Sequence, residues 1–269
     1  MENQAPETPL LGPGMAISAS IAGYRTHLRE IIILLFPPLL LLVLLDALFG
    51  TFLVELPLLR SLIVYAVNVP AGAALMHFFA SRENVEGGRT LAAYADISGK
   101  LPRLYVAGVV QAVLTLPLMA FFLLGIADKG FLCAISIIAV LLYIYLTVRL
   151  MLWIPEIVVR NSRLWDAVGG SWRKTRGNFI AVFGVYFISA ILAGLCVGLP
   201  VVVLQLILGE ATADPAAYSV LGNILDDLTT AVILPFNIGI NLVIFYSLTA
   251  GDADRPQAAA PDSAGGAGG

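Results

Sequence analysis

Few polar side chains lie within the long apolar stretches of this sequence. They include one carboxylate, Asp46, and three amides, Asn68, Asn237 and Asn241. Polar groups inside a membrane span are costly, so each is a functional hypothesis by default. Asn237 and Asn241 lie four residues apart, next to Pro235, and interrupted helices are typical of midplane binding sites. The four residues therefore predict a polar intramembrane site; the alternative is that they only hold helices together, at about 0.6 kcal/mol per hydrogen bond.

A second group of candidate residues is basic and predicts contact with anionic lipid. Arg149 lies near the end of an apolar stretch, where it can either extend to the membrane interface or bind a lipid phosphate. A basic segment follows it. Charges of this kind near an anionic membrane surface contribute about 1 kcal/mol each. The predicted lipid contacts are Arg149, Arg160, Arg163, Arg173, Lys174 and Arg176.

The patterns of soluble enzymes are missing from the sequence. There are two histidines, His27 and His77, and two cysteines, without the spacing of a metal site. No nucleophile–base pair is evident either. We therefore expect a protein that is not an enzyme, with no cofactor, no bound metal and no nucleic-acid partner.

The composition predicts helices that cross a membrane. Hydrophobic residues make up 59% of the 269 residues and charged residues 12%, and the mean hydropathy is +0.92. A helix needs roughly 20 apolar residues to span a bilayer. We predict an all-α protein with six transmembrane helices, at about Ile31–Val54, Leu59–Phe79, Leu104–Ala127, Phe131–Ile154, Phe179–Leu208 and Val220–Ala250.

The positive charges predict the orientation of these helices. Thirteen of the fifteen Lys and Arg residues fall on one side of the six stretches, and only Arg60 and Lys129 fall on the other. Basic loops stay in the cytoplasm, so both termini are predicted to be cytoplasmic. The outer connections are short, which favours three helical hairpins.

A short amphipathic helix is predicted before each hairpin, lying in the membrane interface. The apolar residues that indicate these helices fall within residues 17–28, 90–99 and 164–172. Arg29, Arg103 and Arg176 precede the hairpins at spacings of 74 and 73 residues. A threefold repeat and coincidence both explain this spacing.

The chain divides into three parts. Residues 15–250 form the six-helix membrane domain. Residues 1–14 are polar and acidic, and residues 251–269 are rich in Gly and Ala. Neither terminal segment can bury a core, so both are predicted to be disordered.

One stretch, residues 148–185, carries a family resemblance. It contains Arg149-Leu150, Pro155, Ser171-Trp172 and Thr175-Arg176-Gly177. In this pattern it resembles bacterial proteins of the glycerophosphoryl diester phosphodiesterase membrane-domain family. The resemblance implies a stand-alone membrane domain, because full-length members carry their phosphodiesterase in a separate domain. It implies no catalytic residues.

Two functions fit these observations. The first is a non-enzymatic protein of the bacterial inner (plasma) membrane that organises lipid or a membrane protein partner. The alternative is a transporter or lipid-handling protein that uses the polar intramembrane site. The oligomeric state is left open.

Overall fold

The structure is a computed structural model that describes residues 13–81, 91–127, 131–211 and 215–253, and within these ranges it contains helices and no strand. The fold is therefore all-α, as predicted. The helices are α1 (Pro13–Thr26), α2 (Leu28–Glu55), α3 (Pro57–Ala80), α4 (Ala92–Ser98), α5 (Leu101–Ala127), α6 (Phe131–Leu150), α7 (Trp153–Arg160), α8 (Leu164–Thr175), α9 (Phe179–Ala193), the π-helical turn η1 (Gly194–Gly198), α10 (Leu199–Ala211) and α11 (Pro215–Ala253).

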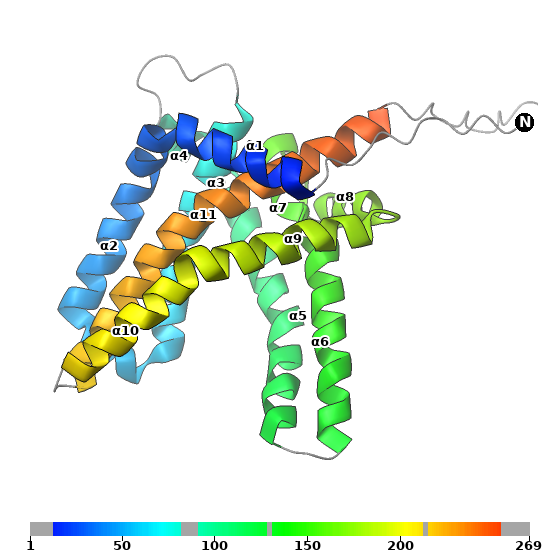
Figure 1. The fold of residues 1–269 in the computed structure, drawn as a ribbon. Coiled ribbons are helices and arrows are strands. Elements are labelled where there is room, and N and C mark those ends of the chain that lie inside the picture. Colours follow the sequence, from blue (N-terminus) through cyan, green and yellow to red (C-terminus); the bar gives the residue numbers. More distant parts are fainter. Residues whose placement is uncertain (1–12, 82–90, 128–130, 212–214, 254–269) are drawn as a thin grey trace, which may run out of the picture.

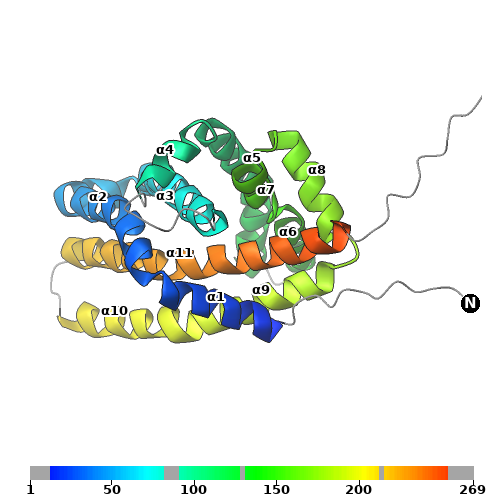
Figure 2. The ribbon, with the colours of Figure 1, turned by 90° about the horizontal axis from the view of Figure 1, so that it is seen from above.

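The long helices form antiparallel pairs (Figure 1). The pairs are α2 with α3, α5 with α6, and the α9–η1–α10 rod with α11. The ends at which the helices of each pair follow one another in the chain lie at the lower side of Figure 1, which we call the turn end. Helices α1, α4, α7 and α8 lie at the upper side, the short-helix end. Figure 2 shows that α11 runs through the middle of the molecule, where it contacts α1, α2, α3, α9 and α10.

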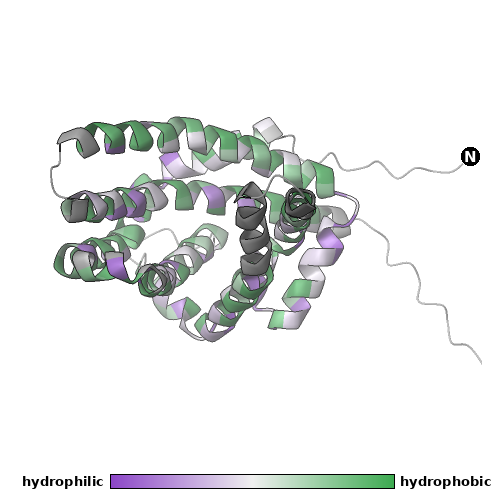
Figure 3. Ribbon diagram, turned by 90° about the horizontal axis from the view of Figure 1, so that it is seen from below, coloured by the Kyte–Doolittle hydropathy of each residue, from purple (hydrophilic) through white to green (hydrophobic). Residues whose placement is uncertain are grey.

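Five helical segments among the described residues are long and apolar enough to cross a membrane. They are Leu28–Gly50, Leu59–Ala80, Ser136–Arg160, Phe179–Leu208 and Ala217–Ala250. Apolar residues predominate along the long helices in Figure 3. Large apolar side chains such as Leu48 and Ile180 are more than two-thirds exposed, which suits a surface that faces lipid tails. The chain is therefore built as a multi-pass membrane protein.

The remaining predicted span coincides with α5. Only Leu101–Leu114 of this helix is found as an apolar segment, shorter than a full span. The side chains of residues 115–127 lie outside the described residues. The sixth crossing thus stays a prediction. So does the interfacial position of α1, α4 and α8, although all three helices form where the sequence predicts short helices.

Helix α7 corrects one predicted boundary. The sequence predicts a span to Ile154 and a loop from Pro155, but α6 ends at Leu150 and a new helix runs from Trp153 to Arg160. Proline is compatible with the first turn of a helix, because the N–H it lacks would have no partner there. Ile157 is fully buried in this new helix. It belongs to a core cluster that joins α7 to α2, α3, α4 and α11.

Two tyrosines in the first half of the bundle donate hydrogen bonds to backbone carbonyls that prolines leave without a partner in α2 and α3. Pro38 cannot bond the Leu34 carbonyl, and Pro70 cannot bond the Ala66 carbonyl. The Tyr94 hydroxyl, on α4, donates to Leu34 O at 2.6 Å, and the Tyr105 hydroxyl, on α5, donates to Ala66 O at 2.8 Å. The two carbonyls released by Pro38 and Pro70 thus become acceptors for neighbouring helices. Burial raises the pKa of Tyr94 to about 12, so its hydroxyl remains a donor at neutral pH.

The predicted terminal segments lie almost entirely outside the residues that the structure describes. Residues 1–12 and 254–269 are not described. Helix α1 begins at Pro13 and α11 continues to Ala253, close to the predicted limits of the membrane domain at residues 15 and 250.

Candidate functional site

At the short-helix end, Ser171 joins α8 to the end of α6. Its hydroxyl accepts the Leu152 N–H at 3.2 Å and donates to the Arg149 carbonyl at 2.6 Å. The last carbonyls of a helix have no partner within it, so such a side chain acts as a cap. Ser171 therefore fixes where α8 sits on the α6 terminus, and it positions the Arg149 backbone.

The Arg149 guanidinium lies among three aromatic rings. Its Cζ is 5.1 Å from the Tyr145 ring centre, 5.2 Å from that of Trp172 and 5.8 Å from that of Phe179. Its Nη1 donates long hydrogen bonds of 3.4 Å to the Trp172 carbonyl and the Thr175 hydroxyl. The buried Nε has no hydrogen-bond partner, and no carboxylate within the described ranges forms an ion pair with Arg149. This cation therefore keeps hydrogen-bonding capacity for an anion.

The residues after Ser171 set the turn into α9. The Thr175 hydroxyl donates to the Ser171 carbonyl at 2.9 Å and accepts from Arg149. Gly177 follows with φ of +87°, a conformation that glycine adopts readily and other residues do not. The Ser-Trp-x-x-Thr-Arg-Gly pattern is thus the framework around Arg149.

Lys174 is buried and paired with another side chain of the protein. It forms an ion pair with Glu156 of α7, and both side chains are 5% exposed. Gly170 makes room for the pair, because a Cβ there would lie 3.0 Å from Glu156 Oε1. The sequence placed Lys174 among the lipid contacts, but burial and pairing hold it between α7 and α8.

The other predicted lipid contacts remain on the surface. Their side chains surround α7 and α8 at the short-helix end, and Arg160 also lies over the Phe245 ring at 5.5 Å. The exposed group comprises Arg160, Arg163, Arg173 and Arg176.

Two further cations cap α7 rather than face outward. Lys100 Nζ donates to the Val158 carbonyl at 2.6 Å, and Arg103 Nη1 donates to Asn161 Oδ1 at 3.1 Å. Cations at a helix C-terminus are stabilised by the helix dipole. Burial lowers the pKa of Lys100.

Asp46 lies at the turn end and pairs with Arg60, which the sequence predicts to lie in a loop. Arg60 donates from Nε to Asp46 Oδ1 at 3.3 Å and from Nη2 to Asp46 Oδ2 at 2.9 Å. Asp227 Oδ2 lies 3.3 Å from the same Nη2. The signals that could have found this cluster are Arg60 itself, an isolated cation beside an apolar stretch, and an acidic pair, Asp226 and Asp227, inside another.

The amides lie elsewhere. Asn241 accepts a hydrogen bond from the Tyr186 hydroxyl and donates to the Asn237 carbonyl at 3.0 Å. Asn241 follows Asp227 by fourteen residues on α11, about 21 Å along the helix. Asn68 is eight residues beyond Arg60 on α3, about 12 Å. The structure brings Asn237 and Asn241 together, but it does not bring Asp46, Asn68 and this pair into one site.

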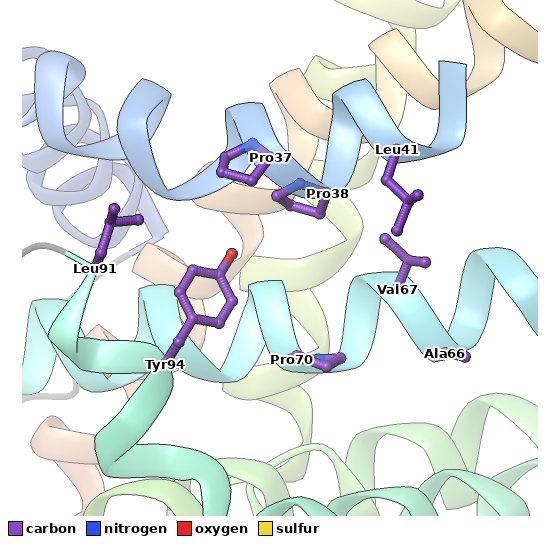
Figure 4. Close-up of a pocket in the computed structure, with 8 residues that line it drawn as sticks. All are labelled: Pro37, Pro38, Leu41, Ala66, Val67, Pro70, Leu91 and Tyr94. Carbon is purple, nitrogen blue, oxygen red and sulfur yellow. The ribbon is translucent and has the colours of Figure 1, made fainter. Parts of the chain in front are cut away.

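An open groove of about 580 Å³ lies between α2, α3 and α4 near the tyrosine–proline contacts (Figure 4). Its lining is apolar except for the Tyr94 hydroxyl. The lining residues are Pro37, Pro38, Leu41, Ala66, Val67, Pro70, Leu91 and Tyr94. Over the described part of the chain, no three His, Cys, Asp or Glu residues group as metal ligands.

Comparison with known proteins gives one match. Residues 116–262, more than half of the chain, match the family described as the membrane domain of glycerophosphoryl diester phosphodiesterase. The match contains the whole Arg149–Gly177 framework. No curated protein and no solved structure matches the chain.

Proposed function

Because this chain belongs to the glycerophosphoryl diester phosphodiesterase membrane-domain family, we propose that it is a non-enzymatic membrane protein that binds anionic lipid at its short-helix end. In this proposal it is a multi-pass protein of the bacterial inner membrane. Both termini are cytoplasmic, and lipid, or a membrane protein partner held through lipid, is organised around α6, α7 and α8. Its bundle crosses the membrane six times.

The environment of Arg149 carries the proposal. A guanidinium presents five N–H donors in a fork that matches the oxygens of a phosphate group. Arg149 uses Nη1 for two long hydrogen bonds and leaves Nε unpaired. The rings of Tyr145 and Trp172 hold it through cation–π contacts. A lipid phosphate would supply the missing counter-charge.

The surroundings of Arg149 support the same ligand. Trp172, 39% exposed, and Trp165, 73% exposed, lie on α8, and tryptophan is typical of the membrane–water interface. The exposed arginines Arg163, Arg173 and Arg176 add positive charge beside them, and such clusters attract anionic headgroups. Lys174 takes no part, since Glu156 neutralises it.

The test compares lipid binding of two charge-matched variants. In nanodiscs of defined composition, we expect Arg149→Gln to bind phosphatidylglycerol about tenfold more weakly. Loss of one charge-assisted hydrogen bond costs on the order of 1.5 kcal/mol, and about 1.4 kcal/mol corresponds to tenfold. Native mass spectrometry of the retained lipids measures the change.

Arg29→Gln is the matched control, because Arg29 is exposed at the start of α2 and the substitution removes the same charge. We expect it to retain most of the lipid. Equal retention by Arg149→Gln and the unmodified protein would rule out Arg149 as the lipid ligand. Equal losses in both variants would indicate attraction without a site. Release of glycerol phosphate from a glycerophosphodiester by the purified chain would overturn the non-enzymatic role.

A further inference from the structure

The Asp46–Arg60–Asp227 cluster places two acidic side chains and one basic side chain in contact inside the bundle. The three come from α2, α3 and α11, and their side chains are 4%, 17% and 3% exposed, respectively. With all three groups ionised, the cluster carries a net charge of −1. An uncompensated charge buried in a membrane protein is strongly unfavourable.

The Arg60 hydrogens that point toward the carboxylates go to Asp46 and to a backbone carbonyl, and none goes to Asp227 Oδ2. Nη2 carries two hydrogens; one goes to Asp46 Oδ2 at 2.9 Å and the other to the Asn223 carbonyl at 3.1 Å. The Nε hydrogen goes to Asp46 Oδ1. Asp227 Oδ2, although 3.3 Å from Nη2, is buried and receives no hydrogen bond. Both Asp46 oxygens therefore have a donor, whereas Asp227 Oδ2 has none.

The surrounding groups do not supply the missing charge. Helix α11 adds Asp226, which is exposed and accepts a hydrogen bond from Gln205 of α10 at 3.4 Å. Helix α2 adds the exposed Glu55 at its end. Arg60 is the cation of α3 that acts on Asp227, and no second cation of the described chain does. The Asp46 carboxyl, by contrast, is a neighbour of the Asp227 carboxyl, because the Oδ2 atoms of both lie within 3.3 Å of Arg60 Nη2.

We propose that Asp46 and Asp227 share one exchangeable proton, so that the cluster is a proton-binding site with Arg60 as its fixed counter-charge. Two carboxylates in contact cannot both remain ionised when one cation serves them. The proton forms an O–H bond at Asp227 Oδ2, which becomes a donor toward Asp46 and cancels the excess charge. Arg60, whose side chain is 17% exposed, is the most exposed of the three. This site is separate from the lipid site at the other end of the molecule.

Loss of the proton would have a mechanical consequence. The two carboxylates would repel each other across the contact between α2 and α11, and α3 would hold only one of them. The site therefore makes the packing of three helices sensitive to pH at the turn end.

Infrared spectroscopy of the full chain in nanodiscs tests the proposal directly. With ¹³C-labelled aspartate, we expect a carboxylic-acid C=O band from one aspartic acid at neutral pH, and loss of this band at alkaline pH. Asp227→Asn and Asp46→Asn should each abolish the band, because the single remaining carboxylate is then neutralised by Arg60.

Asp226→Asn is the matched control, since it removes a neighbouring exposed carboxylate and should leave the band unchanged. The titration of the unmodified protein is a test by itself if a variant does not fold. Absence of a protonated aspartic acid at neutral pH would overturn the proposal. So would a band that persists in both Asp46→Asn and Asp227→Asn.

Discussion

At the scale of single residues, the charges of this protein divide into those paired within it and those left for its surroundings. Lys174 and Glu156 neutralise each other between α8 and α7, and Lys100 caps α7. Arg149 has aromatic neighbours but no carboxylate among the described residues. The charge of a residue therefore does not tell whether a cation is structural or binds a ligand. The partner of each cation within the protein makes this distinction.

The buried pair gives a prediction about stability. Glu156→Leu should lower the free energy of unfolding by about 3 kcal/mol, because it leaves Lys174 buried without its counter-charge. The double variant Glu156→Leu/Lys174→Met should lose less than the single variant, since it replaces both charges with apolar groups. Thermal unfolding in detergent measures both. If the double variant is less stable than the single one, Lys174 is not held by Glu156.

At the scale of elements, prolines and tyrosines work as partners. A proline inside a helix leaves one backbone carbonyl without its helical donor. For two such carbonyls in the first half of the bundle, the hydroxyl of a tyrosine on a neighbouring helix donates the hydrogen bond instead. Tyr94 does so for Pro38 and Tyr105 for Pro70. The prolines of α2 and α3 thus provide attachment points for α4 and α5.

This pairing predicts an energetic coupling. Tyr94→Phe should cost about 1 to 2 kcal/mol of stability, because the Leu34 carbonyl is left unsatisfied. In a Pro38→Ala background the cost should be smaller, since the alanine introduced there has a backbone N–H that can bond the same carbonyl. A double-mutant cycle measured by thermal unfolding checks this.

The control for the cycle is Tyr105→Phe combined with Pro38→Ala. Tyr105 bonds the Ala66 carbonyl on α3, so these two changes should be additive. An equal cost of Tyr94→Phe with and without Pro38 would show that the proline does not create the acceptor.

At the scale of the whole molecule, the described basic residues other than Arg60 lie with the short helices at one end of the bundle. The helix pairs turn at the opposite end, where the Asp46–Arg60–Asp227 cluster lies (Figure 1). With the positive-inside rule, this arrangement predicts that the short-helix end faces the cytoplasm.

Cysteine labelling tests that orientation and the sixth span. With Cys133 and Cys196 changed to Ala, an impermeant maleimide added to intact spheroplasts should label Leu56→Cys and Lys129→Cys but not Asp166→Cys. Inverted vesicles should give the opposite pattern. Leu56 and Asp166 are exposed; residue 129 lies between α5 and α6, outside the described residues. Labelling of Leu56→Cys and Lys129→Cys from opposite sides would contradict six crossings.

The helical class, most of the long apolar helices and the segments where α1, α4 and α8 form can all be predicted from the sequence. These properties depend on consecutive residues: an apolar run of sufficient length must be helical in a bilayer, whatever it packs against. The residues of the Arg149–Gly177 framework were also evident, because they lie close together along the chain.

Which polar residues meet depends on the tertiary structure. Asp46 and Asp227 lie 181 positions apart in the chain, and Tyr186 reaches Asn241 from another helix. Such contacts depend on how each helix is rotated about its axis and on its depth against its neighbours, neither of which a hydropathy pattern contains. For the same reason, Asp46 and Asn68 lie apart from each other and from the pair of Asn237 and Asn241, while Arg60 and Glu156, which the hydropathy pattern left in loops, become the partners of buried charges.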